Sequence, residues 1–216
     1  KKMDTPEGIQ LFHQVGKIVW ADPEIAMIRG SESLLVARTD TARIEEVNTS
    51  DRTYRSLLRI SFSDRNNGWG FDYSTAYKTS DGGKTWKYAD CSGQQSHDDG
   101  PDKTPFGFRF RFIEALKAFS SLELLTVDVG GKIYKTIDGG CHWKQGQVGN
   151  PDDVRGVIGM GFIDDRSGWI WSLSPPSLFM TSDGGKTWRQ VGDLQPLCDA
   201  LVAVSFATPQ QGWATA

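Results

Sequence analysis

The feature that most constrains the fold of this chain is an eight-residue segment that occurs twice without change. It reads Thr-Ser-Asp-Gly-Gly-Lys-Thr-Trp at 79–86 and again at 181–188, 102 residues further on. A third copy at 136–143 keeps the first Thr, the Asp, both glycines and the Trp, so the copies are 57 and 45 residues apart. Internal repeats of this length with β-type patterning are typical of propeller blades or of another stacked array.

A second motif begins with a Phe and ends with a Gly-Trp pair, the Trp lying seven residues after the Phe. It occurs at 62–69, 162–169 and 206–213. Alternating apolar residues between Gly, Asp and Asn clusters divide each full repeat into four short strands. The predicted strands are 57–63, 68–74, 76–80 and 84–89 in one repeat, and 157–163, 168–174, 177–182 and 186–191 in the other. The last two strands of each repeat would form a hairpin whose glycines tolerate positive φ.

Two further units carry weaker signals. In the middle unit, Phe119 and residues 122–129 occupy the expected strand positions without a Gly-Trp pair, and the unit at 33–47 keeps Thr39-Asp40 but has no Gly-Gly or Trp. The sequence therefore predicts one all-β domain over 1–216, a β-propeller of four-stranded antiparallel blades. The predicted repeats are about 16–56 (degenerate), 57–108, 109–155, 156–199 and a partial 200–216.

The ring could close in two ways. Residues 10–20 could complete the last blade of a five-bladed ring, or the chain could be a fragment of a larger ring, which the family resemblance given below favours. A propeller needs closure because an open final blade leaves a sheet edge unpaired.

Composition excludes several classes of protein. The 24 glycines and 8 tryptophans suit tight turns around aromatic anchors. No apolar run has the length of a membrane span, so the chain is not expected to cross a membrane. The net charge of −3 gives no reason to expect nucleic acid as a partner.

The recurring Asp81, Asp138 and Asp183 could be catalytic, because acid–base chemistry uses carboxylates. The structural interpretation is preferred. An Asp at the head of a tight hairpin can accept hydrogen bonds from the following N–H groups and from nearby Thr hydroxyls, while the Trp packs between neighbouring blades. No catalytic residue is predicted. The predicted structural residues are Thr79, Asp81, Gly83, Thr85, Trp86, Thr136, Asp138, Gly140, Trp143, Thr181, Asp183, Gly185, Thr187 and Trp188 in the hairpins, and Phe62, Gly68, Trp69, Phe162, Gly168, Trp169, Phe206, Gly212 and Trp213 in the second motif.

The three cysteines, Cys91, Cys141 and Cys198, contain no C-x-x-C pair, which excludes a disulfide framework and the common zinc spacings. A single disulfide between Cys91 and Cys198 is one interpretation. The other is that all three are small packing residues.

Other metal-ligating residues are scattered. The acidic run 98–102 could hold calcium or be a solvated loop, and its spacing does not match an EF-hand. His97 and His142 each lie near one cysteine, and His13 has no neighbouring candidate ligand, so no four-ligand zinc site forms. Neither a metal nor a cofactor is predicted.

The hairpin motif, Ser/Thr-x-Asp-x-Gly-x-Thr-Trp, is the Asp-box. Together with the Phe-to-Gly-Trp element, it resembles the photosystem II assembly and stability factor family of β-propellers and its bacterial relatives over residues 57–216. The last element departs from the pattern, with Thr208 in place of an Asp. The resemblance implies a non-enzymatic protein that binds a client, such as a membrane-protein subunit or its tail. It also implies an extracytoplasmic location (periplasm, thylakoid lumen or secreted) and Asp-boxes on outer hairpins, away from the binding face.

An arginine-rich stretch runs from 29 to 65 without a lysine. Arginine suits bidentate recognition of carboxylates, and arginine patches in the resembled family are associated with binding client segments. Six acidic residues share the stretch, so ordinary surface pairing is the alternative. The predicted partner-binding residues are Arg29, Arg38, Arg43, Arg52, Arg55, Arg59 and Arg65.

The Asp-box also occurs in two other classes of protein, which gives two alternative functions. Sialidases and other glycoside hydrolases carry it, and carbohydrate would then be the ligand. Arg59-Ile60 resembles the start of the sialidase Arg-Ile-Pro signature, but Ser61 replaces the proline, and none of the seven glutamates has a recognisable catalytic context. A sortilin-like receptor ectodomain is the third alternative, although that class usually adds a cysteine-rich module.

Overall fold

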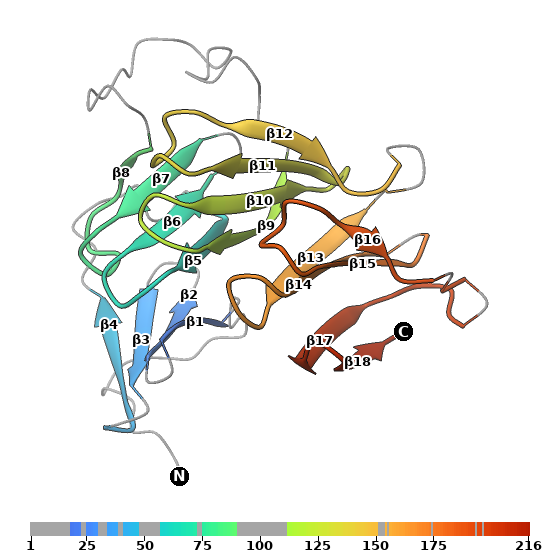
Figure 1. Cartoon of the computed structure of the whole chain (residues 1–216). Helices are drawn as coiled ribbons and strands as arrows, with labels where there is room; N and C mark the ends of the chain where they lie inside the picture. Colours follow the sequence, from blue (N-terminus) through green and yellow to red (C-terminus); the bar gives the residue numbers. More distant parts are fainter. Residues whose placement is uncertain are drawn as a thin grey trace.

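The computed structural model describes residues 18–22, 25–29, 34–38, 41–47, 57–72, 75–89, 112–150, 154, 156–173, 175–192, 194–195 and 197–216. All regular secondary structure within these residues is β-strand, which confirms the all-β prediction. The strands pair into four antiparallel sheets of four strands and one of two strands. Figure 1 shows the sheets following one another around an arc in chain order, the arrangement of a β-propeller.

Each sheet is built from strands that are consecutive in the chain. The first contains β1 (Ile18–Asp22), β2 (Ile25–Arg29), β3 (Leu34–Arg38) and β4 (Arg43–Val47), and the second β5 (Arg59–Phe62), β6 (Gly68–Phe71), β7 (Ala76–Thr79) and β8 (Lys87–Tyr88). The third contains β9 (Ile113–Ala118), β10 (Leu124–Asp128), β11 (Lys132–Thr136) and β12 (Lys144–Gln147). The fourth contains β13 (Val157–Phe162), β14 (Gly168–Ser172), β15 (Ser177–Thr181) and β16 (Arg189–Gln190), and the last β17 (Ala203–Thr208) and β18 (Gln211–Thr215).

Residues 18–20 lie in β1 and pair with β2 in the first sheet. Residues 10–17, the rest of the stretch that could complete the last blade, lie outside the described residues. One expectation about strand placement needs correction. The first strand of the third sheet ends at Ala118, before Phe119, which instead opens the turn to β10 by donating its N–H to Glu123 O. This unit has no Gly-Trp pair, so the sequence offered no marker for where its first strand begins.

The cores lie between neighbouring sheets, because each sheet buries one face against the next. Met27 and Leu34 of the first sheet pack with Phe62 and Trp86 of the second. All four side chains are at most 3% exposed, and the rings of Phe62 and Trp86 meet edge to face at 6.0 Å. The Asp-box Trp86 therefore lies between two blades.

Specific polar contacts also join successive sheets. Lys78 of β7 donates to the backbone oxygen of Gly139 at 2.7 Å, and Lys135 of β11 donates to that of Gly184 at 3.1 Å. Both acceptors are the first glycine of the following Asp-box. The lysine that immediately precedes the first threonine of an Asp-box thus links its own sheet to the Asp-box hairpin of the next sheet.

The cysteines also differ from expectation. Cys141 is disulfide-bonded, whereas Cys198 is free. Both interpretations of the cysteines are therefore wrong, the Cys91–Cys198 disulfide because Cys198 is free and the set of three packing residues because Cys141 is bridged. Cys91 lies outside the described residues.

Candidate binding surface

The three Asp-box hairpins share one hydrogen-bond network. In the first copy, Thr79 Oγ1 donates to Asp81 Oδ1 at 2.8 Å and accepts the N–H of Gly83 at 2.9 Å. Thr85 donates its N–H to Asp81 Oδ1 and its hydroxyl to Asp81 Oδ2 at 2.6 Å. Both oxygens of the Asp81 carboxylate are therefore engaged inside the hairpin.

The other two copies repeat this geometry. Asp183 accepts hydrogen bonds from Thr181 Oγ1 and from the N–H and hydroxyl of Thr187. In the middle copy a histidine replaces the last threonine, and His142 Nδ1 lies 2.7 Å from Asp138 Oδ2. The two hydrogen bonds of His142 are the main reason that the pKa of Asp138 falls to about 2.

These carboxylates are poor candidates for acid–base chemistry. Burial alone would raise the pKa of Asp183, but hydrogen bonds from Thr187, Thr181 and the Lys186 backbone lower it to about 2. Within the described residues, the carboxyl groups with a clear pKa shift all move downward, namely Asp64, Asp81, Asp138, Asp164 and Asp183. A glycosidase general acid needs the opposite shift.

The hydrogen bonds to Asp183 predict that part of the protein's folding stability is lost in acid. Its folded-state pKa is about 2 against an ordinary 3.8, so the stabilisation is present above about pH 4 and is lost as the pH falls towards 2. Because the site is solvent-screened, we expect a loss of about 1 kcal/mol. Urea unfolding of the wild type and of Asp183→Asn, measured from pH 5 to pH 2, checks this. The variant should lose this part of the pH dependence, and identical pH profiles would contradict the assignment.

The turn after the first strand of each Gly-Trp element is also capped locally. Asp64 Oδ1 accepts the N–H groups of Asn66 and Asn67 at 2.8 Å each. Asp164 accepts those of Arg166 and Ser167 in the same way. In the last element, the substituted Thr208 does the same through its hydroxyl, accepting from Gln210 and Gln211 at 3.3 and 3.1 Å. The capping hydrogen bonds of this turn are therefore kept although Thr replaces Asp.

The structure separates the predicted partner-binding arginines. Arg59 is an inter-sheet contact, since its Nη2 lies 2.9 Å from Glu114 Oε1 and its Nε donates to Glu114 O at 2.7 Å. Arg65 lies exposed in the turn between β5 and β6. Arg29 ends β2 but its side chain lies outside the description, and Arg52 and Arg55 lie outside the described residues.

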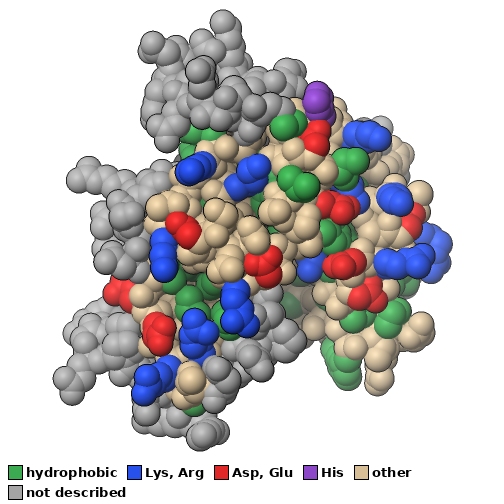
Figure 2. Space-filling model, turned by 60° about the vertical axis from the view of Figure 1, so that its left-hand side comes forward, with side chains coloured by type: hydrophobic (Ala, Val, Ile, Leu, Met, Phe, Trp, Pro, Cys, Tyr) green, Lys and Arg blue, Asp and Glu red, His purple; other side chains and the backbone are tan. Residues whose placement is uncertain are grey.

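Two of the arginines form a basic pair. Arg38 ends β3 and Arg43 begins β4, and the strand register places them directly opposite each other. Glu45 is the acidic neighbour, with Oε2 3.8 Å from Arg38 Nε, and both of these side chains are solvent-accessible. In Figure 2, Lys and Arg side chains gather on the lower left of the visible face, with acidic side chains among them. Like charges directly opposite each other on a hairpin are destabilising.

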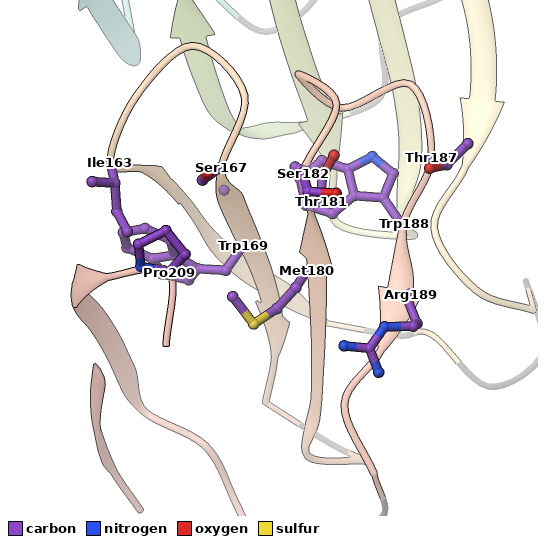
Figure 3. Close-up of a pocket in the computed structure, with 11 residues that line it drawn as sticks. Ile163, Ser167, Trp169, Met180, Thr181, Ser182, Thr187, Trp188, Arg189 and Pro209 are labelled. Atoms are coloured by element: carbon purple, nitrogen blue, oxygen red, sulfur yellow. The ribbon is translucent and has the colours of Figure 1, made fainter. Parts of the chain in front are cut away.

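Two grooves of about 380 Å³ each lie beside the fourth sheet. The first, which we call the end groove, lies next to the β17–β18 turn (Figure 3). Its lining residues are Ile163, Ser167, Gly168, Trp169, Met180, Thr181, Ser182, Thr187, Trp188, Arg189 and Pro209. The second lies between the third sheet and the last Asp-box, and is lined by Ile133, Lys135, Lys144, Gln145, Gly146, Gln147, Gly185, Lys186, Thr187 and Trp188. No carboxylate lines either groove, so neither offers the pair needed for glycoside hydrolysis.

Metal sites receive no support from the described part of the chain, which contains no cluster of three or more His, Cys, Asp or Glu side chains. His142 is held by Asp138. The acidic run 98–102, His97 and His13 lie outside the described ranges. No helix within those ranges is long and apolar enough to cross a membrane.

Sequence reasoning missed the residues that join the sheets. Lys78 and Lys135 each immediately precede the threonine of an Asp-box, and this recurrence was visible in the sequence. Glu114, the partner of Arg59, carries no such signal because the pair spans 55 residues.

Comparison with known proteins supports the fold. No protein-family model and no curated protein sequence matches the chain. An ancestral GH74 enzyme superposes with a TM-score of 0.61 at 12% identity, over 93% of this chain and 27% of that one. YCF48 bound to a D1 peptide gives 0.52 at 15% identity, over 97% and 77%. The extracellular domain of a putative one-component system from B. thetaiotaomicron gives 0.53 at 8% identity, over 92% and 28%. At these identities the likeness establishes the fold alone, and that fold is a β-propeller.

Proposed function

We propose that this chain is a non-enzymatic, protein-binding β-propeller scaffold, similar in role to the photosystem II assembly factors. Its basic pair, Arg38 and Arg43, binds a carboxylate-bearing segment of a client protein. The client we propose is a membrane-protein subunit or its tail.

The juxtaposition of Arg38 and Arg43 carries this proposal. Two guanidinium groups opposite each other repel, and Glu45 at 3.8 Å offsets that repulsion only weakly. A client carboxylate would neutralise the pair and use the fork geometry in which arginine donates two parallel hydrogen bonds.

Two further observations support a scaffold role. YCF48, which has the same fold, has a solved structure with a D1 peptide bound. Both oxygens of the Asp81 and Asp183 carboxylates accept hydrogen bonds inside their own hairpins, which favours a structural role over action on a substrate. We propose an extracytoplasmic location as well, because disulfides such as that of Cys141 persist in oxidising compartments.

Removing the basic pair should weaken client binding. We expect Arg38→Gln together with Arg43→Gln to reduce affinity for a short extended peptide rich in Asp and Glu by about tenfold or more. Fluorescence anisotropy with a labelled peptide measures this. The wild-type affinity should also fall as salt rises from about 0.05 M to about 0.5 M, because solvent-exposed charges are screened.

The matched control removes two other exposed positive charges, by Lys144→Gln together with Lys186→Gln in the second groove. It changes the net charge equally and should leave peptide binding within about twofold. Equal weakening by both double variants would mean that net charge, and not the basic pair, attracts the peptide. A peptide with Asn and Gln in place of Asp and Glu should not bind.

A glycoside hydrolase is the second candidate, because the ancestral GH74 enzyme has the highest TM-score of the structures compared above. This chain spans about a quarter of that enzyme. Assays on fluorogenic sialosides and β-glucans run beside the binding experiment distinguish the two. Sugar release that persists through purification would overturn the scaffold proposal.

A further inference from the structure

The second groove lies between the third sheet and the Asp-box hairpin of the fourth sheet. One wall is formed by β11 and β12, where Gly146 lies directly opposite Ile133. The other wall is the hairpin segment 185–188, whose turn is fixed by hydrogen bonds to Asp183. The volume of about 380 Å³ falls within the range of about 300 to 1,000 Å³ that is usual for small-ligand sites. Because hydrogen bonds fix both walls, the groove is preformed.

A difference between two repeats opens this groove. Gly146 and Ala89 each lie three residues after the Trp of an Asp-box, so they are equivalent. Ala89 is 2% exposed, and its backbone oxygen would lie 2.8 Å from a Cβ on Gly140 of the next hairpin. Gly146 is exposed, and the nearest atom that a Cβ there would meet is Ile133 Cβ, at 3.9 Å. A glycine inside a strand often marks a place where a ligand approaches closely.

The preceding residue of the outer strand changes in the same direction. In the second sheet it is Tyr88, which packs against the first core cluster and whose ring centre lies 4.9 Å from that of Tyr77. In the third sheet it is Gln145, which is exposed and lines the groove. The outer strand of the third sheet thus offers an amide and bare backbone where the second sheet offers a phenol ring and a methyl group. This surface suits hydrogen bonding to a polar ligand.

The charge of the groove is positive. Its lining includes Lys135, Lys144 and Lys186 and no carboxylate. Lys135 is already engaged, by Glu123 at 2.9 Å and by the backbone oxygen of Gly184 at 3.1 Å. Lys144 and Lys186 are exposed, and neither forms an ion pair within the described residues. Lysine ammonium groups are compact charges that bind the oxygens of phosphate and similar anions.

The tryptophan in the groove wall differs from its two equivalents. Trp86 and Trp143 donate their indole N–H to the backbone oxygens of Gly83 and Gly140, at 3.0 Å each. The Nε1 of Trp188 is buried and has no acceptor within the described part of the chain. A buried donor without an acceptor costs free energy. A ligand oxygen that reached this nitrogen would remove that cost.

We propose that the second groove binds a sugar that carries a sulfate or phosphate ester. The ester lies between Lys144 and Lys186, which donate charge-assisted hydrogen bonds to its oxygens. The ring hydroxyls pair with the amide of Gln145, and the C–H groups of the ring pack on Ile133 and Trp188. The groove binds the sugar without cleaving it, because its lining offers no carboxylate pair.

This inference goes beyond the proposed function and can fail separately from it. The basic pair lies in the first sheet, whereas the second groove lies between the third and fourth sheets. The two places also take different ligands, a carboxylate-bearing peptide and a sugar ester.

Glucose 6-sulfate and glucose 6-phosphate are the probes, added to the ¹⁵N-labelled full chain. We expect saturable shifts of the amide signals of residues 144–147 and 185–188 in nuclear magnetic resonance spectra. Glucose and inorganic sulfate, the two halves of the ligand, should each bind at least about tenfold more weakly than the better ester. The ester that binds more tightly distinguishes the two sources, a sulfated polysaccharide and a phosphorylated sugar.

Two variants locate the site. Lys144→Gln together with Lys186→Gln should weaken ester binding about tenfold or more, while Arg38→Gln together with Arg43→Gln should change it by less than about twofold. This is the reverse of the order expected for the acidic peptide. Gly146→Val should also weaken ester binding about tenfold, because its side chain restores bulk where Ala89 closes the preceding interface. Thermal unfolding checks that each variant remains folded.

Four results would overturn the proposal. They are the absence of saturable shifts at these amides with either ester, equal ester binding by the lysine double variant, binding of inorganic sulfate as tight as that of the esters, and displacement of the ester by the peptide rich in Asp and Glu. The third would mean that the groove attracts anions without recognising a sugar. The last would mean that it is a second peptide site.

Discussion

Trp69→Ala should lower the free energy of unfolding by about 4 kcal/mol, because it removes a fully buried indole and leaves a cavity. The ring meets that of Trp143 edge to face at 6.4 Å, and its Nε1 donates to Ser120 O in the next sheet at 2.9 Å. Truncation therefore removes contacts on both sides of an inter-sheet core. Urea unfolding followed by far-ultraviolet circular dichroism measures the change without depending on the missing fluorophore.

The chain contains its own control for this experiment. Trp213 occupies the same motif position but is 62% exposed, so Trp213→Ala should cost less than about 1 kcal/mol. Similar losses in the two variants would mean that inter-sheet packing is not what makes Trp69 important.

Gly140→Ala should destabilise the fold by about 3 kcal/mol. Gly140 has φ of 95°, and a Cβ there would lie 2.8 Å from the backbone oxygen of Ala89 in the preceding sheet. A backbone atom cannot move aside as a flexible side chain would, so the methyl group adds a steric clash to an unfavourable φ. The hairpin would have to withdraw from its neighbour. Thermal and urea unfolding quantify the loss.

Gly192→Ala is the matched control for the backbone part of that cost. Gly192 also has a positive φ, 57°, but a Cβ there meets no atom within 4 Å. This variant should lose only about 1 kcal/mol. If both variants lose the same free energy of unfolding, close packing between the Gly140 hairpin and Ala89 contributes nothing to stability.

The sequence predicted the propeller because its strongest signals are local. The Asp-box and the Gly-Trp element are short, and the side chains that cap their turns bond to residues at most four positions away, as Thr79 does to Gly83. Spacing alone therefore placed the hairpins of the second and fourth sheets. The strands of the third sheet were predicted less accurately, because Leu124-Leu125 stands where the Gly-Trp pair would be.

The candidate surface was less predictable, because it depends on contacts between distant residues. Counting arginines could not separate Arg59, which is engaged by Glu114, from Arg38 and Arg43, which the β3–β4 register brings together. Charge composition over 29–65 favoured ordinary surface pairing. Only the fold shows which of these guanidinium groups face a like charge.

Because equivalent tryptophans are buried to different extents, their intrinsic fluorescence should respond differently to a dissolved quencher. Trp213 is the most exposed tryptophan among the described residues, while Trp69 is sealed inside the protein. Dissolved iodide should quench the emission of the first and leave that of the second unaffected. The quenching of Trp213 would then report the solvent accessibility of β18 in unlabelled protein, through a natural fluorophore and without a probe.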